Sequence, residues 1–160
     1  MKPLEPLPLS SRGEFVEAVL AVLAHARRDV LLYDRDFCDW PLDHPQTCRL
    51  LAALPRDGAR PSLRLLVRDP DWLERHAPRF AELRRQLGAA AQCRQAPASV
   101  APAEGILIAD EMHLVRRAHH GRFRGRLSLA RPADVEACLP KYQSLWDEST
   151  PCLSATPLGL

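Results

Sequence analysis

Three carboxylates and a tryptophan stand close together in the segment Asp34-Arg-Asp-Phe-Cys-Asp39-Trp40. The segment follows a short apolar run, and ligands of open α/β sheets bind outside the carboxyl ends of strands. Asp34, Asp36 and Asp39 can therefore hold a cation or a polar small molecule. The plainer interpretation, which we favour, is a solvated loop whose acids cap backbone N–H groups while Trp40 covers the core.

A second polar pair, Arg68 and Asp69, follows the next apolar run, Leu63–Val67. If both runs are neighbouring parallel strands, this pair lies at the same edge of the sheet as the acidic segment. A ligand contact by Arg68 is one interpretation. A local ion pair or a helix cap is the other, and we favour it because such pairs are common on protein surfaces.

The most distinctive polar feature is a basic segment that occupies eleven positions near the C-terminal third of the chain. Its basic residues are Arg116, Arg117, His119, His120, Arg122, Arg124 and Arg126. In an extended strand, residues two apart project from the same face, so Arg122, Arg124 and Arg126 are expected to form a row. Guanidinium groups match phosphate geometry. The alternative, which we favour because the net charge is only +2, is an edge strand that charge keeps from aggregating.

Several other kinds of chemistry have no sequence support. The chain has no Gly-x-Ser-x-Gly nucleophile elbow, no phosphate-cradling glycine loop and no Cys-x-x-Cys pair. The cysteines are widely separated, at Cys38, Cys48, Cys93, Cys138 and Cys152. We interpret them as small hydrophobic residues in a reducing cytoplasm. We predict no metal and no cofactor.

Composition is that of an ordinary globular domain. The 160 residues fit one domain, with 46% hydrophobic and 26% charged residues. A net charge of +2 predicts no strong field for nucleic acid. The longest apolar run is too short to span a bilayer, which takes about 20 residues. We therefore expect a cytoplasmic location.

Apolar periodicity predicts an order of helices and strands between a Pro-rich arm at 1–10 and a loose tail at 150–160. Ser11 and Glu14 form a capping-box pattern at the first helix, and we expect Pro78 and Pro140 to interrupt or bend later helices. Helices are expected at 11–26, 43–54, 70–87 and 132–148. Strands are expected at 29–34, 63–67, 91–95, 105–109, 112–115 and 124–129. Strands that alternate with helices predict an α/β domain over 11–149, with a mixed, mainly parallel sheet and helices on both faces; the last three strands are expected to be antiparallel.

This order of elements resembles one half of a phospholipase D-like protein, with two local matches. The stretch Gly105-Ile-Leu-Ile-Ala-Asp110 looks like the strand that carries that family's His-x-Lys-x4-Asp motif, and the stretch from Arg126 to Trp146 looks like its closing strand and helix. With Asp110 on the motif's aspartate, Ala103 takes the position of the histidine and Gly105 that of the lysine. In the family the histidine attacks phosphorus, and alanine cannot.

The resemblance therefore implies the fold without the family's reaction. Our first hypothesis is a non-catalytic phospholipase D-like domain that binds a phosphate-bearing ligand or a protein partner. The second is a phosphodiesterase or nuclease with a rearranged site built on Asp110 and the basic segment. The candidate ligand-binding residues are Asp34, Asp36, Asp39, Arg68, Asp110, Arg116, Arg117, Arg122 and Arg124. Half-domains of this family often pair; without the motif, we expect a monomer or a weak homodimer.

Overall fold

One eight-stranded sheet organises the chain, in the order β1-β7-β6-β5-β2-β3-β4-β8. The computed structural model describes residues 4–56, 60–100, 104–119 and 121–153. The strands are β1 (Leu7–Leu9), β2 (Val30–Asp34), β3 (Leu63–Val67), β4 (Ala91–Gln95), β5 (Gly105–Ala109), β6 (His113–Arg117), β7 (Gly125–Ser128) and β8 (Thr150–Pro151). The α-helices are α1 (Arg12–His25), α2 (Pro45–Ala52), α3 (Asp71–His76), α4 (Pro78–Leu87) and α5 (Pro132–Asp147).

The prediction of a mainly parallel sheet is wrong, although the sheet is mixed as expected. Only β2, β3 and β4 are parallel neighbours, and the other pairs are antiparallel. A parallel neighbour requires a crossover of a dozen or more residues, usually a helix. The described residues between Gln95 and Gly105 contain no helix. The chain instead passes to the other side of β2, where β5 pairs antiparallel with it.

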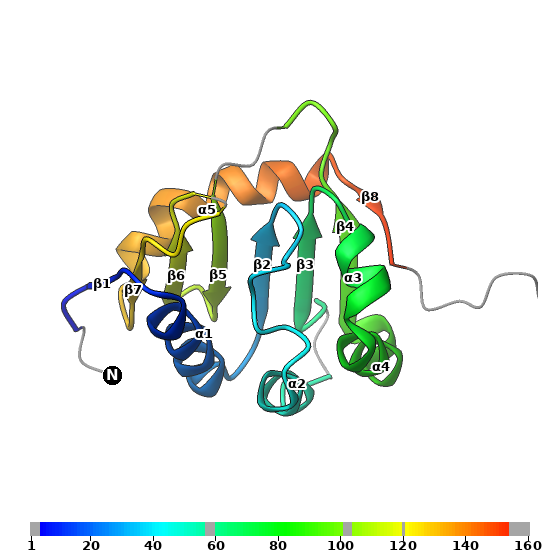
Figure 1. The fold of residues 1–160 in the computed structure, drawn as a ribbon, viewed down its shortest axis with the longest axis horizontal. Helices are drawn as coiled ribbons and strands as arrows, with labels where there is room; N and C mark the ends of the chain where they lie inside the picture. The colour runs from blue at the N-terminus through cyan, green and yellow to red at the C-terminus, as the bar shows by residue number, and fades with distance from the viewer. Residues whose placement is uncertain (1–3, 57–59, 101–103, 120, 154–160) are drawn as a thin grey trace, which may run out of the picture.

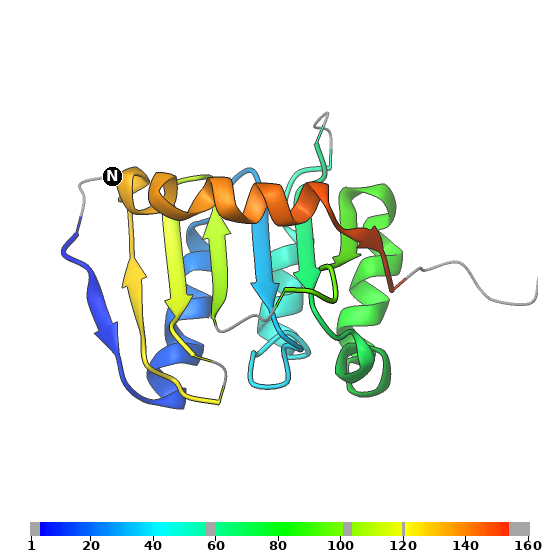
Figure 2. The same ribbon diagram turned by 90° about the horizontal axis from the view of Figure 1, so that it is seen from above.

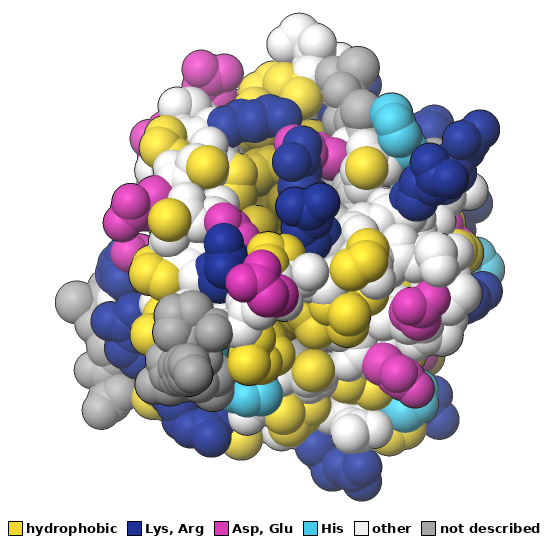
Figure 3. All heavy atoms as spheres, turned by 90° about the vertical axis from the view of Figure 1, so that its left-hand side faces the viewer, with side chains coloured by type: hydrophobic (Ala, Val, Ile, Leu, Met, Phe, Trp, Pro, Cys, Tyr) yellow, Lys and Arg dark blue, Asp and Glu magenta, His cyan; other side chains and the backbone are white. Residues whose placement is uncertain are grey.

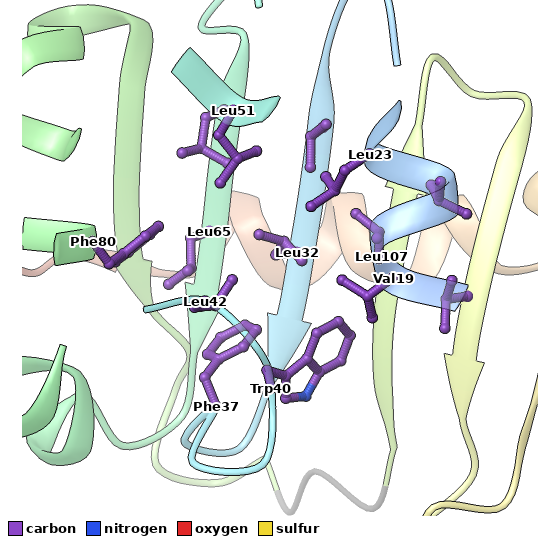
Figure 4. Close-up of a cluster of buried hydrophobic side chains, with 14 of the residues drawn as sticks. Val19, Leu23, Leu32, Phe37, Trp40, Leu42, Leu51, Leu65, Phe80 and Leu107 are labelled. Atoms are coloured by element: carbon purple, nitrogen blue, oxygen red, sulfur yellow. The ribbon is translucent and has the colours of Figure 1, made fainter. Parts of the chain in front are cut away.

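Helices cover both faces of the sheet, as predicted. The helices α1 to α4 lie on one face and α5 crosses the other (Figures 1 and 2). Alternate residues of the central strand enter the two cores: Val30 and Leu32 face the four helices, whereas Leu31 and Tyr33 face α5. Figure 4 shows the larger core, where side chains of α1, α2 and α4 meet β2, β3 and β5. None of the helices in the described part of the chain has the length and apolarity that crossing a bilayer requires.

Local signals in the sequence account for the ends of several helices. Ser11 Oγ accepts the Glu14 N–H at 3.1 Å, which is the N-cap half of the predicted capping box. The Glu14 carboxylate accepts the Ser11 hydroxyl at 3.2 Å, in place of the Ser11 backbone N–H that a full capping box would use. The predicted third helix is split before Pro78 into α3 and α4. Pro140, by contrast, lies inside α5, which is one continuous helix.

Both edges of the sheet are formed by segments that we expected to be irregular. Within the arm, β1 pairs antiparallel with β7, and within the tail, β8 pairs antiparallel with β4. Each edge strand contains a proline, Pro8 or Pro151. Proline is tolerated in edge strands because one side of such a strand needs no N–H donor. Residues 1–3 of the arm and 154–160 of the tail lie outside the described residues.

Candidate functional site

The carboxylate of Asp34 is buried at the carboxyl end of β2, with 1% of the residue exposed. Its Oδ2 atom accepts the N–H groups of Asp36 at 3.2 Å and Phe37 at 2.9 Å. These bonds hold a turn in which Phe37 adopts a φ of +64°. Burial raises the pKa of Asp34 above its usual value, while the two backbone donors oppose that rise. The carboxylate thus organises its own loop.

The other two acids of this loop also have partners within the protein. Asp36 accepts the N–H of Cys38 at 3.1 Å. Asp39 forms an ion pair at 3.0 Å with Arg117 Nη2, and the Arg117 side chain is only 1% exposed. The Arg117 guanidinium also lies 4.8 Å from the centre of the Phe123 ring. The structure therefore turns Arg117 into the core, where it joins β6 to the acidic loop.

Gly105 occupies the position at which the lysine of the resembled motif would project. A Cβ atom at this residue would lie 2.5 Å from Asp34 Oδ1 and 2.9 Å from Cζ2 of Trp40. The space beside the start of β5 is thus filled by a carboxylate and an indole ring. Ala103, at the histidine position of the motif, lies outside the described residues.

Asp110 lies at the opposite end of the sheet from Asp34, because β2 and β5 run antiparallel. Its carboxylate accepts the backbone N–H groups of Arg27, Arg28 and Asp29 at 2.8, 2.7 and 3.1 Å. Asp110 therefore fixes the connection between α1 and β2. Asp34 and Asp110 do not share a pocket, which a joint catalytic site would require.

Arg68 lies near Asp34, and its backbone N–H donates to the Asp34 carbonyl at 3.3 Å. Its guanidinium is used within the protein: Nε donates to the carbonyl of Val100 at 3.0 Å and Nη2 to that of Ala98 at 2.9 Å. Arg68 thus holds the segment that follows β4.

A basic groove lies between β6, β7 and the first turns of α5. Its volume is about 620 Å³, and Figure 3 shows Lys and Arg side chains gathered beside a hollow in this side of the molecule. Arg116 and Arg126 are direct cross-strand partners. The residues that line the groove are Pro6, Leu114, Arg116, Ala118, Arg124, Gly125, Arg126, Ser128, Arg131, Asp134 and Ala137.

The four arginines of the groove differ in how far they are already neutralised. Arg116 Nε lies 2.7 Å from Glu104 Oε2, and Arg131 Nε lies 2.9 Å from Asp134 Oδ2. Arg124 and Arg126 are exposed, and no carboxylate of the described residues forms an ion pair with either. A hydrogen bond from Ser128, together with the charges of Arg131 and Arg126, lowers the pKa of Asp134. Among the described residues, two guanidinium groups of the groove are thus held in ion pairs and two, those of Arg124 and Arg126, are exposed and form none.

Sequence reasoning placed only part of this groove. Arg116 and Arg124 lie in it, whereas Arg117 is buried and the Arg122 side chain is exposed without lining it. Arg131 and Asp134 were missed, because they come from the start of α5 rather than from the basic segment. The Arg-Pro pair at the start of a predicted helix was the available signal. His120 lies outside the described residues.

The chemistry available in the groove is anion binding. Guanidinium groups donate paired hydrogen bonds to phosphate and carboxylate oxygens. No histidine or cysteine is among the described residues that line the groove, so it presents neither of these nucleophiles. Across the described residues, no group of three His, Cys, Asp or Glu side chains is placed to hold a metal ion.

Comparison with known proteins identifies one family and several solved folds. Residues 11–157 match a family described as a domain of unknown function, DUF7931. No curated protein matches the chain.

Two of the similar solved structures are Nuc from Salmonella typhimurium, a phospholipase D family member, and NucT from Helicobacter pylori. Nuc has a TM-score of 0.61 and 13% identity, over 94% of this chain and 100% of that one. NucT has a TM-score of 0.58 and 9% identity, over 92% and 99% of the two chains. A third is the archaeal chromatin protein TrmBL2, with a TM-score of 0.65 and 13% identity over 92% of this chain. The chain spans only 54% of TrmBL2. At these identities the likeness establishes a phospholipase D-like fold.

Proposed function

The chain belongs to the domain-of-unknown-function family DUF7931, and we propose that it is a non-catalytic phospholipase D-like domain that binds a phosphate-bearing ligand in its basic groove. The observation that carries this proposal is the pair Arg124 and Arg126, exposed in the groove and held in no ion pair among the described residues. Arg126 lies in β7 and Arg124 directly precedes that strand. Residues two apart along an extended backbone are separated by about 7 Å. The two guanidinium groups can therefore engage separate oxygens or neighbouring phosphates.

Three features support binding over hydrolysis. The sequence contains no His-x-Lys. The space next to Gly105 is filled by Asp34 and Trp40. The Asp110 carboxylate is occupied by three backbone N–H groups at the far end of the sheet. A rearranged phosphodiesterase site, the alternative hypothesis, would need Asp110 near the arginines that hold the phosphate.

The binding proposal is tested by fluorescence anisotropy with three probes. Because one structural neighbour is described as a DNA-binding chromatin protein, the probes are a labelled single-stranded oligonucleotide, the same sequence as a duplex, and inorganic pyrophosphate as a competitor. Arg126→Gln should weaken binding about tenfold, as expected for the loss of a charge-assisted contact. Affinity should also fall as salt rises.

The matched control is Arg75→Gln, which removes one exposed arginine of α3 outside the groove. This variant should bind like the wild type, because Arg75 does not line the groove, and it is matched to Arg126→Gln because both remove one positive charge. Equal losses in both variants would attribute binding to overall charge and would refute a groove-specific site. Absence of binding to every probe would refute the proposal itself.

The non-catalytic part of the proposal has its own test. Incubation with bis(p-nitrophenyl) phosphate should release no p-nitrophenol above the buffer rate. Release that follows the folded protein through purification and disappears in Arg126→Gln would reinstate the rearranged phosphodiesterase.

A further inference from the structure

Two cysteines lie opposite one another at the edge of the sheet farthest from the basic groove. The register of β4 and β8 pairs Arg94 with Pro151 and Gln95 with Thr150. Its continuation places Cys93 opposite Cys152, and the Cys152 N–H donates to the Cys93 carbonyl at 3.0 Å.

This position has the geometry that a disulfide needs. Directly opposed residues of an antiparallel pair have Cα atoms about 4.5–5.5 Å apart and side chains on the same face. Disulfides span Cα separations of about 4.4–6.8 Å. Both cysteines are free thiols in the structure, and both pack against the core beneath α4. The register therefore brings the two thiols within the Cα separation that an S–S bond spans.

The surroundings determine how the two thiols react. Arg84 of α4 is near both, and its charge favours their thiolates, but burial dominates. Burial raises the pKa of Cys93 to about 12 and that of Cys152 to about 11. The thiols are therefore poor nucleophiles while β8 is in place. Cys152 is the more accessible of the two, because it follows a two-residue strand whose residues are exposed.

We infer that Cys93 and Cys152 form a redox-sensitive latch, in which oxidation by a hydroperoxide joins β8 covalently to β4. Opening of β8 exposes Cys152, whose thiol sulfur attacks one oxygen of the hydroperoxide; the O–O bond breaks, the thiol proton goes to the leaving oxygen, and the products are a sulfenic acid and an alcohol, or water when the oxidant is hydrogen peroxide. The Cys93 sulfur then attacks the sulfenic sulfur, the S–S bond forms, and the sulfenic oxygen leaves as water. The two sulfurs supply the two electrons that reduce one peroxide. This inference is independent of ligand binding in the groove.

The other three cysteines provide controls within the same chain. Cys38 lies in the loop after β2, Cys48 on α2, and Cys138 on α5, which covers the opposite face. No strand register places any of these three opposite another cysteine. A Cys138→Ser variant therefore removes a thiol without touching the latch.

The test uses the full chain. The protein is treated with hydrogen peroxide, its remaining thiols are alkylated, and peptides are mapped by mass spectrometry before and after reduction. We expect a Cys93–Cys152 linked peptide in the wild type and in Cys138→Ser, which disappears on reduction. Because the bond closes a long loop, the melting temperature should rise by about 5 °C or more on oxidation. Peroxide should not raise it in Cys152→Ser.

Two outcomes would overturn the latch. One is a wild-type map in which Cys93 and Cys152 both remain open to alkylation after unfolding in denaturant. The other is a map in which Cys93 is linked to a cysteine other than Cys152 of the same chain. Both are read from the wild-type protein, so the test stands even if Cys152→Ser fails to fold.

Discussion

Gly105 is packed so closely that a single added methyl group would overlap its neighbours. Its Cβ would contact Asp34 Oδ1 at 2.5 Å and Trp40 Cζ2 at 2.9 Å, and both groups are buried. Overpacking of this kind typically costs about 1–3 kcal/mol. We expect Gly105→Ala to lower the free energy of unfolding by this amount in a urea titration.

The control for this prediction is Gly13→Ala in the first turn of α1, where an added Cβ meets nothing within 4 Å. That change should be neutral or stabilising, by up to about 1 kcal/mol, because alanine favours the helix. If the two variants have equal free energies of unfolding, the side chains of Asp34 and Trp40 can move away from an added Cβ at Gly105, and the prediction is wrong.

His113 should make the stability of the protein depend on pH in the mildly acidic range. Its Nδ1 accepts the Ala130 N–H at 2.9 Å, so the ring is neutral in the fold. Burial, and then the nearby His25, lower the pKa of His113 below its usual value of 6.5. The unfolded state therefore binds a proton more readily, and stability that is complete above pH 6.5 is lost as the pH falls through the lower folded value.

Urea titrations at pH 7.5 and 5.5 measure this effect. The wild type should be less stable at pH 5.5, and the difference should shrink in His113→Gln. The same substitution at the exposed His76 should leave the difference in place. An unchanged difference in His113→Gln would assign the pH dependence to other groups.

At the scale of elements, Glu104 ties α5 to the sheet. Its carboxylate accepts hydrogen bonds from Arg116 at 2.7 Å, Lys141 at 2.8 Å and Tyr142 at 2.6 Å, which come from β6 and α5. Hydrogen bonds to a charged group contribute about 1.5–3 kcal/mol. Glu104→Gln should therefore lower the free energy of unfolding by a comparable amount, whereas Glu136→Gln on the exposed side of α5 should change it little.

The same residue predicts part of the acid denaturation. Burial alone would raise the pKa of Glu104, but the bonds from Lys141, Tyr142 and Arg116 outweigh it and lower the pKa to about 2. The stabilisation is complete above the ordinary value of 4.5 and is lost as the pH falls from there toward 2. Wild type and Glu104→Gln should accordingly converge in stability over this range in acid titrations followed by circular dichroism. If the difference in stability between wild type and Glu104→Gln stays constant from pH 4.5 toward pH 2, Glu104 does not titrate in this way.

Local sequence predicted the helices and the inner strands, but neither the two edge strands nor the pairing of the strands. The N-cap at Ser11, the helix break at Pro78 and the buried β2 are set by residues near one another in the chain. Strand partners are set by contacts over long separations, so the antiparallel pairing of β5 with β2 was not readable from either strand. The prolines of the arm predict an irregular segment, but an edge strand tolerates proline, and β1 forms there.

The same distinction applies to the candidate site. Neighbours in a strand face opposite sides, so Arg116 points to the groove while Arg117 enters the core. Composition does not show which of these two arginines is exposed and which is buried, because that depends on how β6 is aligned with β7. Asp134 enters the groove from α5, and no pattern within the basic segment points to it.

At the scale of the whole molecule, the sheet edges favour a monomer. The outer strands β1 and β8 are short, and each contains a proline that withholds an N–H from any further strand. Sedimentation at micromolar concentration should therefore give a species with the 17.9 kDa mass of one chain. A stable species of twice that mass would indicate pairing through another surface.

The placement of β1 has a consequence for the order in which the protein is made. Leu7 pairs with Leu127 and Leu9 with Gly125, so β1 leaves the ribosome long before its partner β7. The nascent chain can assemble β2 and β3, which are joined through α2, long before β7 exists. Since ribosomes add about 5–20 residues per second, β1 stays unpaired for several seconds. During that interval Pro8 limits which other strands can pair with β1, and the sheet closes at this edge only once β7 has been made.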